Sequence, residues 1–515
     1  MFLRNKLKAL FDKHFNLLLI LLFGSLIWLY FYTALKSFGY DDEYYNIRLI
    51  TENNLSQLIK LLETSDVHPP LAYVFNYLLF KLTNNWSYVR LFSTILYLAS
   101  LLYLVIKTEN KTQKILLILL LGFNPTVLLW GTSIRWYAYA APLLIYISVL
   151  PDYKKTLYWI KFFSCFLVFA YMEYVGVILM MAYFLYYWLE DKTPIWSKIK
   201  RIFWPGFVFM ILYIPQLYIF FTIHRKNNVA ENQQTFDLKT SIISTISSNF
   251  SNQGVFPLSI AGIISIIGAA ILFLTLLIQI IKRKKIEAIW ISCLASVVLF
   301  LVTGLAGKVR NLILLEPARN LSLSSLYSSK KNQLFVVGIL CLLVGNTVGV
   351  KNVLMHQQTT KNSWNIPFDA TMKTLERLET PEMEEVYFTH SPTFTYHFTQ
   401  QRKQFISLYS GLYFDSSKIT TTVQKLEVDS AKKRNCTFIL TYRGNSIHPE
   451  HFAAMLAEME KIKSDSVKRI NLGYDDEVQL KRRFFPDYPE YGVRIIKYYG
   501  AAGDLRQLHL WEINP

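Results

Sequence analysis

The sequence carries little charge for its length. Only 17% of its 515 residues are Asp, Glu, Lys or Arg, whereas soluble proteins carry about a quarter. Apolar residues make up 52% and aromatic residues 16%, with a mean hydropathy of +0.26. Many of the apolar residues fall in runs longer than the helices of a soluble core. These features exclude a soluble enzyme and a disordered scaffold, and they predict a polytopic α-helical membrane protein.

Cysteine is also scarce, with four residues in the chain. Cys165, Cys293 and Cys341 lie in apolar runs, and Cys436 stands alone in the polar C-terminal region. The absence of any CxxC pair or disulfide framework excludes a disulfide-rich secreted module. The sequence likewise contains no internal repeat and no low-complexity stretch.

The net charge of +18 is unevenly distributed along the chain. Residues 351–515 hold 22 Lys and Arg against 20 Asp and Glu, whereas residues 1–350 hold 32 against 16. Basic residues collect in the cytoplasmic loops of membrane proteins. We therefore attribute the surplus of basic residues to the membrane topology and do not expect nucleic-acid binding.

About eleven apolar runs approach the roughly 20 residues that a membrane helix needs. The first, near residues 15–35, follows several basic residues and has no small-residue cleavage site, which predicts a retained helix that starts in the cytoplasm. The run near 309–327 is the weakest, because Glu316 and Arg319 interrupt it. The others lie near 88–106, 115–133, 136–150, 157–172, 173–189, 205–223, 259–281, 286–305 and 333–350.

The distribution of basic residues also predicts the orientation of these helices. With the N-terminus inside, the inside segments are short and yet carry 19 Lys and Arg, as the positive-inside rule expects. We therefore expect insertion in the inner (plasma) membrane with a cytoplasmic N-terminus. The first loop, 36–87, and the C-terminal region would then both be extracytoplasmic.

The sequence predicts that the C-terminal region, 351–515, forms a small mixed α/β domain after a membrane domain at 1–350. Its histidines show no metal-ligand spacing, so they indicate no particular chemistry. The expected strands are 385–389, 436–441 and 493–499, and the expected helices are 369–380 and 449–463.

The first loop opens with three adjacent carboxylates, Asp41, Asp42 and Glu43, directly after the first helix. Such a cluster at a membrane interface is costly unless something uses it. A general base or a ligand for a hard cation needs carboxylates of this kind. The alternative is a solvated helix cap.

The same loop ends with Asp66, His68 and the prolines at 69–70, followed by an amphipathic stretch at 72–82. The prolines can begin a helix that lies along the membrane surface. His68 could hydrogen-bond a phosphate or an acceptor. It could equally belong to an ordinary turn before that helix.

Arg135 lies between two apolar runs on the outside face. An arginine in that position usually has an anionic partner, and a guanidinium suits a lipid phosphate because it offers several donors and keeps its charge. The alternative is snorkelling to the interface. The same argument applies, more weakly, to Arg310. Glu173, between two helices on the same side, could be functional but is more typical of a polar turn.

Taken in order, these motifs resemble those of GT-C-type integral-membrane glycosyltransferases. Asp42-Glu43 followed by Tyr44-Tyr45 is similar to the Asp-Glu motif of the enzymes that use polyprenyl-phosphate sugars. Asp66-Val-His-Pro-Pro-Leu resembles a segment of protein O-mannosyltransferases (glycosyltransferase family 39), and Pro-Pro-Leu occurs in lipid A aminoarabinose transferases. Further similar segments are Trp86-Ser-Tyr-Val-Arg-Leu-Phe-Ser and Arg135-Trp-Tyr-Ala-Tyr.

The resemblance implies that the protein transfers a sugar to an envelope glycan, lipid or protein. The donor would be a polyprenyl-phosphate sugar whose chain lies among the membrane lipids. Asp42 would be the general base of an inverting displacement, and Glu43 or Asp41 would position the acceptor or a metal. No cofactor is required, although the carboxylates could hold a divalent metal. The residues expected to bind substrate or stabilise the phosphate are Asp66, His68, Arg135, Tyr137 and Arg310.

Two other classes of protein compete with this interpretation. A transporter or flippase for a lipid-linked sugar would use such carboxylates to relay protons, and inverted repeats or broken helices at the midplane would support it. The sequence shows neither signal. A non-catalytic scaffold whose C-terminal region binds a partner would leave the carboxylates and Arg135 unexplained.

Overall fold

The computed structural model describes the helical region and parts of the C-terminal region. The described residues are 2–36, 41–64, 68–150, 152–224, 259–283, 289–303, 312–327, 333–359, 368–378, 384–389, 392–401, 405–407, 409–410, 413–414, 435–442, 493–499 and 509–513. They form two compact units. Among them, unit 1 holds residues 2–36 and 55–354, and unit 2 holds residues 41–54 and those from 355 onward. The expected division of the chain at residue 350 stays a prediction.

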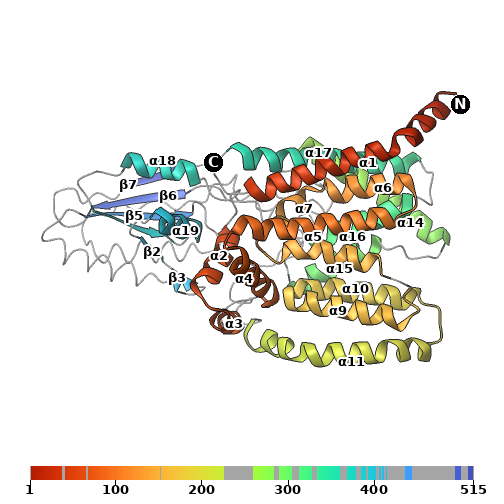
Figure 1. Cartoon of the computed structure of the whole chain (residues 1–515), viewed down its shortest axis with the longest axis horizontal. Helices are drawn as coiled ribbons and strands as arrows, with labels where there is room; N and C mark the ends of the chain where they lie inside the picture. Colours follow the sequence, from red (N-terminus) through yellow and green to blue (C-terminus); the bar gives the residue numbers. More distant parts are fainter. Residues whose placement is uncertain are drawn as a thin grey trace. The chain divides into compact units, whose positions relative to one another are not determined.

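Among the described residues of unit 1, the regular elements are all helices (Figure 1). Its helices are α1 (Phe2–Lys36), α3 (Leu55–Thr64), α4 (Leu71–Thr83), α5 (Trp86–Lys107), α6 (Lys111–Leu117), α7 (Pro125–Trp130), α8 (Tyr137–Ser148), α9 (Thr156–Met172), α10 (Tyr174–Glu190), α11 (Ile195–Ile219), α14 (Ile260–Arg283), α15 (Ile289–Thr303), α16 (Leu312–Tyr327) and α17 (Gln333–Thr359). Two π-helical turns follow α6 and α11, at η1 (Ile118–Gly122) and η2 (Phe220–His224).

Among the residues that the structure describes, four helical stretches are long and apolar enough to cross a membrane: Asp12–Lys36, Trp86–Lys107, Ile195–Ile223 and Leu334–Met355. Large apolar side chains on these stretches are exposed, such as Trp204 at 66% and Tyr218 at 69%. Such surfaces are stable in lipid and not in water. The chain is therefore a mostly helical integral membrane protein. The expected total of about eleven membrane helices stays a prediction.

The apolar run expected as one helix at 115–133 is broken in the structure. It forms α6, η1 and α7, because Pro125 lacks a backbone N–H and starts a new helix that the side chain of Asn124 caps. The π-helical turn leaves carbonyl groups for partners outside the helix. Tyr97 Oη donates to Leu121 O at 2.7 Å, Asn320 Nδ2 to Leu120 O at 2.7 Å and Asn346 Nδ2 to Leu119 O at 3.2 Å.

Helices α14 and α17 approach each other closely at two glycines. A Cβ atom added to Gly268 would lie 2.8 Å from Gly338 O, and one added to Gly338 would lie 3.0 Å from Gly268 O. Small residues permit this approach, as they do in other membrane helix pairs. Around it, side chains of η1, α14, α16 and α17 pack into one buried apolar cluster that includes Leu120, Leu272 and Phe335.

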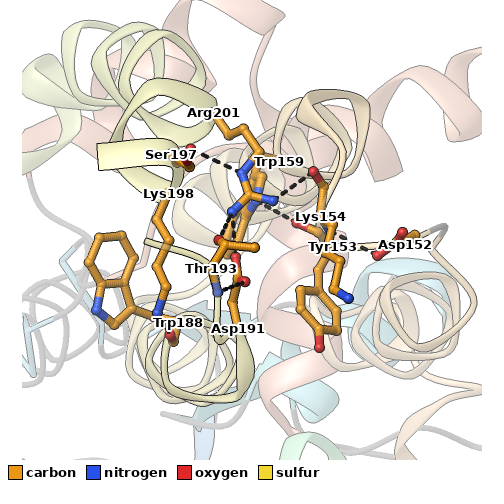
Figure 2. Close-up of polar contacts among 10 residues, drawn as sticks. All are labelled: Asp152, Tyr153, Lys154, Trp159, Trp188, Asp191, Thr193, Ser197, Lys198 and Arg201. Carbon is orange, nitrogen blue, oxygen red and sulfur yellow. Dashed lines mark hydrogen bonds and ion pairs between the residues drawn. The ribbon is translucent and has the colours of Figure 1, made fainter. Parts of the chain in front are cut away.

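Helix α9 packs against both α10 and α11, and a polar cluster joins the three at one end (Figures 1 and 2). Arg201 Nη2 donates to Asp191 Oδ2 at 2.6 Å and to Thr193 Oγ1, and Arg201 Nη1 donates to Lys154 O at 2.7 Å. Lys198 Nζ donates to Trp188 O at 2.9 Å. One guanidinium from α11 therefore ties together the segments that precede α9 and follow α10.

Unit 2 contains a five-stranded sheet of order β2-β1-β5-β6-β7. Its strands are β1 (Glu384–Thr389), β2 (Phe405–Ser407), β5 (Asn435–Tyr442), β6 (Val493–Tyr499) and β7 (His509–Ile513). β1 pairs in parallel with β2 and β5, and β6 pairs antiparallel with β5 and β7. A second, two-stranded sheet pairs β3 (Tyr409–Ser410) with β4 (Tyr413–Phe414).

The strands expected at 385–389, 436–441 and 493–499 are β1, β5 and β6. The helix expected at 369–380 is α18 (Phe368–Leu378), and the one expected at 449–463 lies outside the described residues. α19 (Pro392–Gln401) connects β1 to the parallel strand β2, so these three elements form a βαβ unit.

Candidate functional site

The three carboxylates of the first loop open helix α2 (Asp41–Glu52), which belongs to unit 2. Asp41 and Asp42 are its first two residues, and their side chains lie outside the described part of the structure. Glu43 is buried, with 1% of its surface exposed. A carboxylate in the first turn is favoured by the helix dipole. The acidic motif is thus built into a helix rather than into a flexible loop.

Helix α2 packs on α19, the helix between β1 and β2. The Tyr44 ring lies 5.2 Å from Tyr396 and 5.4 Å from His397, and His397 Nε2 lies 3.3 Å from Tyr44 Oη. Ile47 and Ile50 continue the buried face of α2. The acidic helix is therefore held by the C-terminal elements of unit 2, an association that sequence reasoning did not predict.

Within unit 1, Arg135 sits in a tight, buried turn between α7 and α8. Gly131 N donates to Val127 O at 2.7 Å, and Ser133 Oγ donates to Trp130 O at 2.7 Å. Ser93 Oγ of α5 lies 3.5 Å from Gly131 O. The turn is fixed by its own backbone, so the guanidinium has a defined position and is not a snorkelling side chain.

Arg135 is brought together with His68, Tyr73 and Glu173, and we call these four residues the Arg135 cluster. Arg135 Nη2 lies 3.3 Å from His68 Nε2, and Arg135 Nη1 lies 3.5 Å from Tyr73 Oη. His68 Nδ1 lies 2.8 Å from Glu173 Oε2. The four residues come from the segment before α4, from α4 itself, from the turn before α8 and from the junction of α9 and α10.

The charges of the Arg135 cluster are largely withdrawn from solvent. Arg135 is 4% exposed and Glu173 is 6% exposed, whereas 26% of the His68 side chain is exposed. Tyr137, the first residue of α8, is buried, and its ring centroid lies 6.0 Å from Arg135 Cζ. A buried guanidinium beside a partly accessible imidazole is a suitable arrangement for binding an anionic oxygen group.

The predicted site residues therefore fall into three groups. His68, Arg135 and Tyr137 lie together in unit 1, whereas Asp41, Asp42 and Glu43 belong to unit 2. Asp66 and Arg310 lie outside the described residues. Within the part of the chain that the structure describes, no group of three or more His, Cys, Asp or Glu residues could hold a metal ion.

Sequence reasoning missed the roles of Glu173 and Tyr73. The sequence favoured a polar turn at Glu173 over a functional role, and the structure shows that its Oε1 accepts from the backbone N–H of Tyr174 at 3.0 Å while its Oε2 contacts His68. The available signal was a lone carboxylate between two apolar runs, which needs a partner when buried. Tyr73 lies in an amphipathic stretch rich in aromatic residues and gave no separate signal.

A second polar group is buried where α16 meets the broken helix. Glu316 is 1% exposed, and its Oε2 accepts from Asn124 Nδ2 at 2.9 Å. Arg319 is 4% exposed, and its Nε and Nη2 each lie 3.2 Å from Asn320 Oδ1. Glu316, which weakened the sequence prediction of this helix, thus contacts the break between η1 and α7.

Comparisons with known proteins gave a likeness in structure but none in sequence. No protein-family model and no curated protein sequence matches the chain. The chain is similar to crystal structures of ArnT from Cupriavidus metallidurans, in the apo state (TM-score 0.46) and bound to undecaprenyl phosphate (TM-score 0.47). In both cases identity is 11% over 85% of this chain and 94% of that chain.

Proposed function

We propose that this protein is a membrane glycosyltransferase that takes a sugar from a polyprenyl-phosphate donor on the extracytoplasmic face. The observation that carries the proposal is the Arg135 cluster. A buried guanidinium in a membrane protein is costly unless an anion compensates it. Glu173 contacts His68, and His68 contacts Arg135. A buried guanidinium beside a partly exposed imidazole suits the phosphate of a lipid-linked sugar, because both groups can bind an anionic oxygen.

The proposed reaction is a single displacement at the anomeric carbon. Asp42 takes the proton of the acceptor hydroxyl as that oxygen attacks, and the configuration inverts. Glu43 or Asp41 positions the acceptor or a divalent metal. Arg135 and His68 stabilise the charge that develops on the departing phosphate, where preorganised donors act most strongly. The acceptor is an envelope glycan, lipid or protein.

The test of this function is turnover of a defined donor by the purified protein. Wild type in detergent is offered a panel of polyprenyl-phosphate sugars and an envelope extract, with and without chelator, and release of polyprenyl phosphate is measured. Asp42→Asn should lower the rate by roughly 10²–10⁴. Glu52→Gln, in the same helix and ion-paired with Arg48, serves as the matched control. Equal rates for Asp42→Asn and wild type would exclude Asp42 as the base.

A transporter of a lipid-linked sugar is the second candidate, and one observation favours it. The helix broken at η1 and Asn124 lies beside the buried Glu316 and Arg319, and broken helices with buried charges are typical of transporters. Liposomes containing the protein separate the two candidates. Movement of a lipid-linked sugar between leaflets without donor cleavage would favour the transporter.

A further inference from the structure

The end of unit 1 at which Arg201 joins α9, α10 and α11 holds more positive than negative charge. Residues 152–155 and 190–201 together contain six Lys and Arg against three Asp and Glu. One of the three carboxylates, that of Asp191, already accepts from Arg201 at 2.6 Å. The exposed basic residues are Lys154, Lys155, Lys192 and Lys200. This end therefore presents a surplus of ammonium groups on its surface.

The first two turns of α11 extend beyond the hydrocarbon core of a membrane. Residues 202–221 contain no Asp, Glu, Lys or Arg. A helical stretch of that length spans about 30 Å, which is the thickness of the hydrocarbon core. Lys198, Lys200 and Arg201 come directly before it, so they lie at the level of the lipid headgroups.

Two of these basic residues point toward the protein. Lys198 Nζ donates to Trp188 O at 2.9 Å, and Arg201 Nη1 donates to Lys154 O at 2.7 Å (Figure 2). The second bond holds the backbone of the turn before α9 against the start of α11. Lys155 follows in the same turn, so two exposed lysines are brought next to this end of α11.

The other face of α11 points away from the protein. Trp196, Lys200 and Trp204 follow one another at intervals of four residues, which places them on one face of the helix, and all three are exposed. Tryptophan side chains are enriched where a membrane meets water. A lysine between two such residues can extend its long, flexible side chain along the headgroups.

We propose that Lys154, Lys155 and Lys200 bind the headgroup of an anionic phospholipid in the leaflet at this end of the helices. Trp196 and Trp204 lie on either side of the lipid along α11. Charge complementarity selects this occupant, because the phosphodiester of an anionic lipid carries a negative charge that no ammonium group of its own offsets. Basic groups between membrane helices are typical sites for such headgroups. The inference does not depend on the proposed function.

A lipid held in this way would connect two segments of the chain. Lys154 and Lys155 precede α9, whereas Lys200 belongs to α11, and the two helices pack against each other. The headgroup would stabilise that packing from the lipid side, as Arg201 does from the protein side. Bound anionic lipid should therefore raise the unfolding temperature of the protein.

The experiment compares lipids on the full-length protein in neutral, lipid-free detergent. Phosphatidylglycerol and phosphatidylcholine with the same acyl chains are titrated separately, and native mass spectrometry gives the affinity of the first bound lipid. Each lysine contributes about fivefold to the affinity for an anionic headgroup, so wild type should bind phosphatidylglycerol at least about tenfold more tightly. Phosphatidylglycerol, and not phosphatidylcholine, should also raise the unfolding temperature.

A triple variant and a matched control distinguish a site from general attraction to negative charge. Lys154→Gln, Lys155→Gln and Lys200→Gln together should reduce the preference for phosphatidylglycerol to within about twofold. The control replaces three exposed lysines of α1, α3 and α4 in the same way and should keep the preference. Its changes are Lys36→Gln, Lys60→Gln and Lys81→Gln.

Two further measurements guard against misfolding and against a simple phosphate site. Without lipid, wild type and both triple variants should unfold at the same temperature. If the first triple variant is unstable, Lys200→Gln alone should still lower the preference about fivefold. Glycerol phosphate, the headgroup chemistry without acyl chains, should not displace bound phosphatidylglycerol.

Four results would overturn the inference. They are equal binding of the two lipids by wild type, an unchanged preference in the variants at Lys154, Lys155 and Lys200, an equal loss of preference in the control, and displacement of the lipid by glycerol phosphate. Because the measurements use neither a sugar donor nor an acceptor, each of these results would leave the proposed function standing.

Discussion

At the scale of single residues, buried polar side chains hold the irregular parts of unit 1. Asn124 caps α7 through Oδ1, which accepts from Val127 N at 2.9 Å, and donates through Nδ2 to Glu316. Asn320 reaches the carbonyl of Leu120 on the other side of the break. Side chains of one helix, α16, thus form hydrogen bonds with polar groups on both sides of the break between η1 and α7, as burial in a membrane requires.

Loss of the Glu316 carboxylate should destabilise this arrangement. Glu316→Ala leaves Asn124 Nδ2 without its acceptor, which should cost about 1–3 kcal/mol. Glu316→Gln keeps an acceptor oxygen at the same place and should cost less. Thermal unfolding in detergent measures both, with exposed Glu109→Ala as the control. If Glu316→Ala and Glu316→Gln unfold at the same temperature, the hydrogen bond contributes nothing to stability.

At the scale of elements, helices α9, α10 and α11 depend on a polar clamp at one end (Figure 2). Asp191 is 2% exposed and its carboxylate accepts from Arg201 and from Thr193 N. Arg201 also binds the carbonyls of Ser197 and Lys154. α11 presents most of its other surface to the membrane, so this clamp and its packing on α9 fix where it lies.

Removal of the guanidinium should loosen α11. Arg201→Ala leaves the buried Asp191 carboxylate without its cation, and we expect a loss of about 2 kcal/mol, below the range for fully buried pairs because Arg201 is partly exposed. Arg201→Lys should restore stability only in part, since an ammonium cannot form the planar fork. Unfolding temperature in detergent is the measurement, with Lys200→Ala as the control. A normal temperature for Arg201→Ala would contradict this role.

The same clamp predicts a dependence of stability on pH. Asp191 lies in the loop between α10 and α11. Burial opposes ionisation of its carboxyl group, but hydrogen bonds from Thr193 and the charges of Arg201 and Lys198 outweigh burial and lower its pKa. Its contribution is therefore present above the unfolded pKa of about 3.9 and is lost as pH falls through the lower folded value. Below about pH 4, wild type should lose stability more steeply than Asp191→Asn, and parallel unfolding curves would contradict this.

At the scale of the whole molecule, contacts within unit 1 bring together segments that the distribution of basic residues assigns to the same side of the membrane. His68, Arg135 and Glu173, all expected outside, contact one another. Lys111 Nζ bonds to Asp12 Oδ1 at 2.6 Å, and both residues are expected near the inside face. The Arg201 clamp likewise joins segments expected inside. The charge pattern and the packing thus assign the same segments to the same ends.

The absolute orientation is a separate prediction. In a background without the four native cysteines, Glu109→Cys should react with a membrane-impermeant thiol reagent only from the cytoplasmic side. Leu82→Cys, which replaces a residue that is 82% exposed, should react only from the outside. Labelling of intact cells and of inverted vesicles measures both. The reverse pattern would place the Arg135 cluster on the cytoplasmic side and contradict use of an extracytoplasmic donor.

The sequence by itself determined several helices and strands and the membrane character of this protein. Apolar runs and proline positions act locally, so the helix before the first loop, the helix that follows the prolines at 69–70 and strands β1, β5 and β6 could be read directly. Arg135 and His68 could also be singled out, because an ionisable side chain next to an apolar run is costly unless it has a partner.

Only the tertiary structure decided which of these residues meet. Glu173 lies 105 residues from His68, and Glu316 lies 192 residues from Asn124. Helix packing sets such contacts, and no local pattern encodes them. The structure also assigned the acidic helix α2 to unit 2 and the Arg135 cluster to unit 1. The physical reason is that α2 buries Tyr44 and its other apolar residues against α19, a helix more than 340 residues further along the chain.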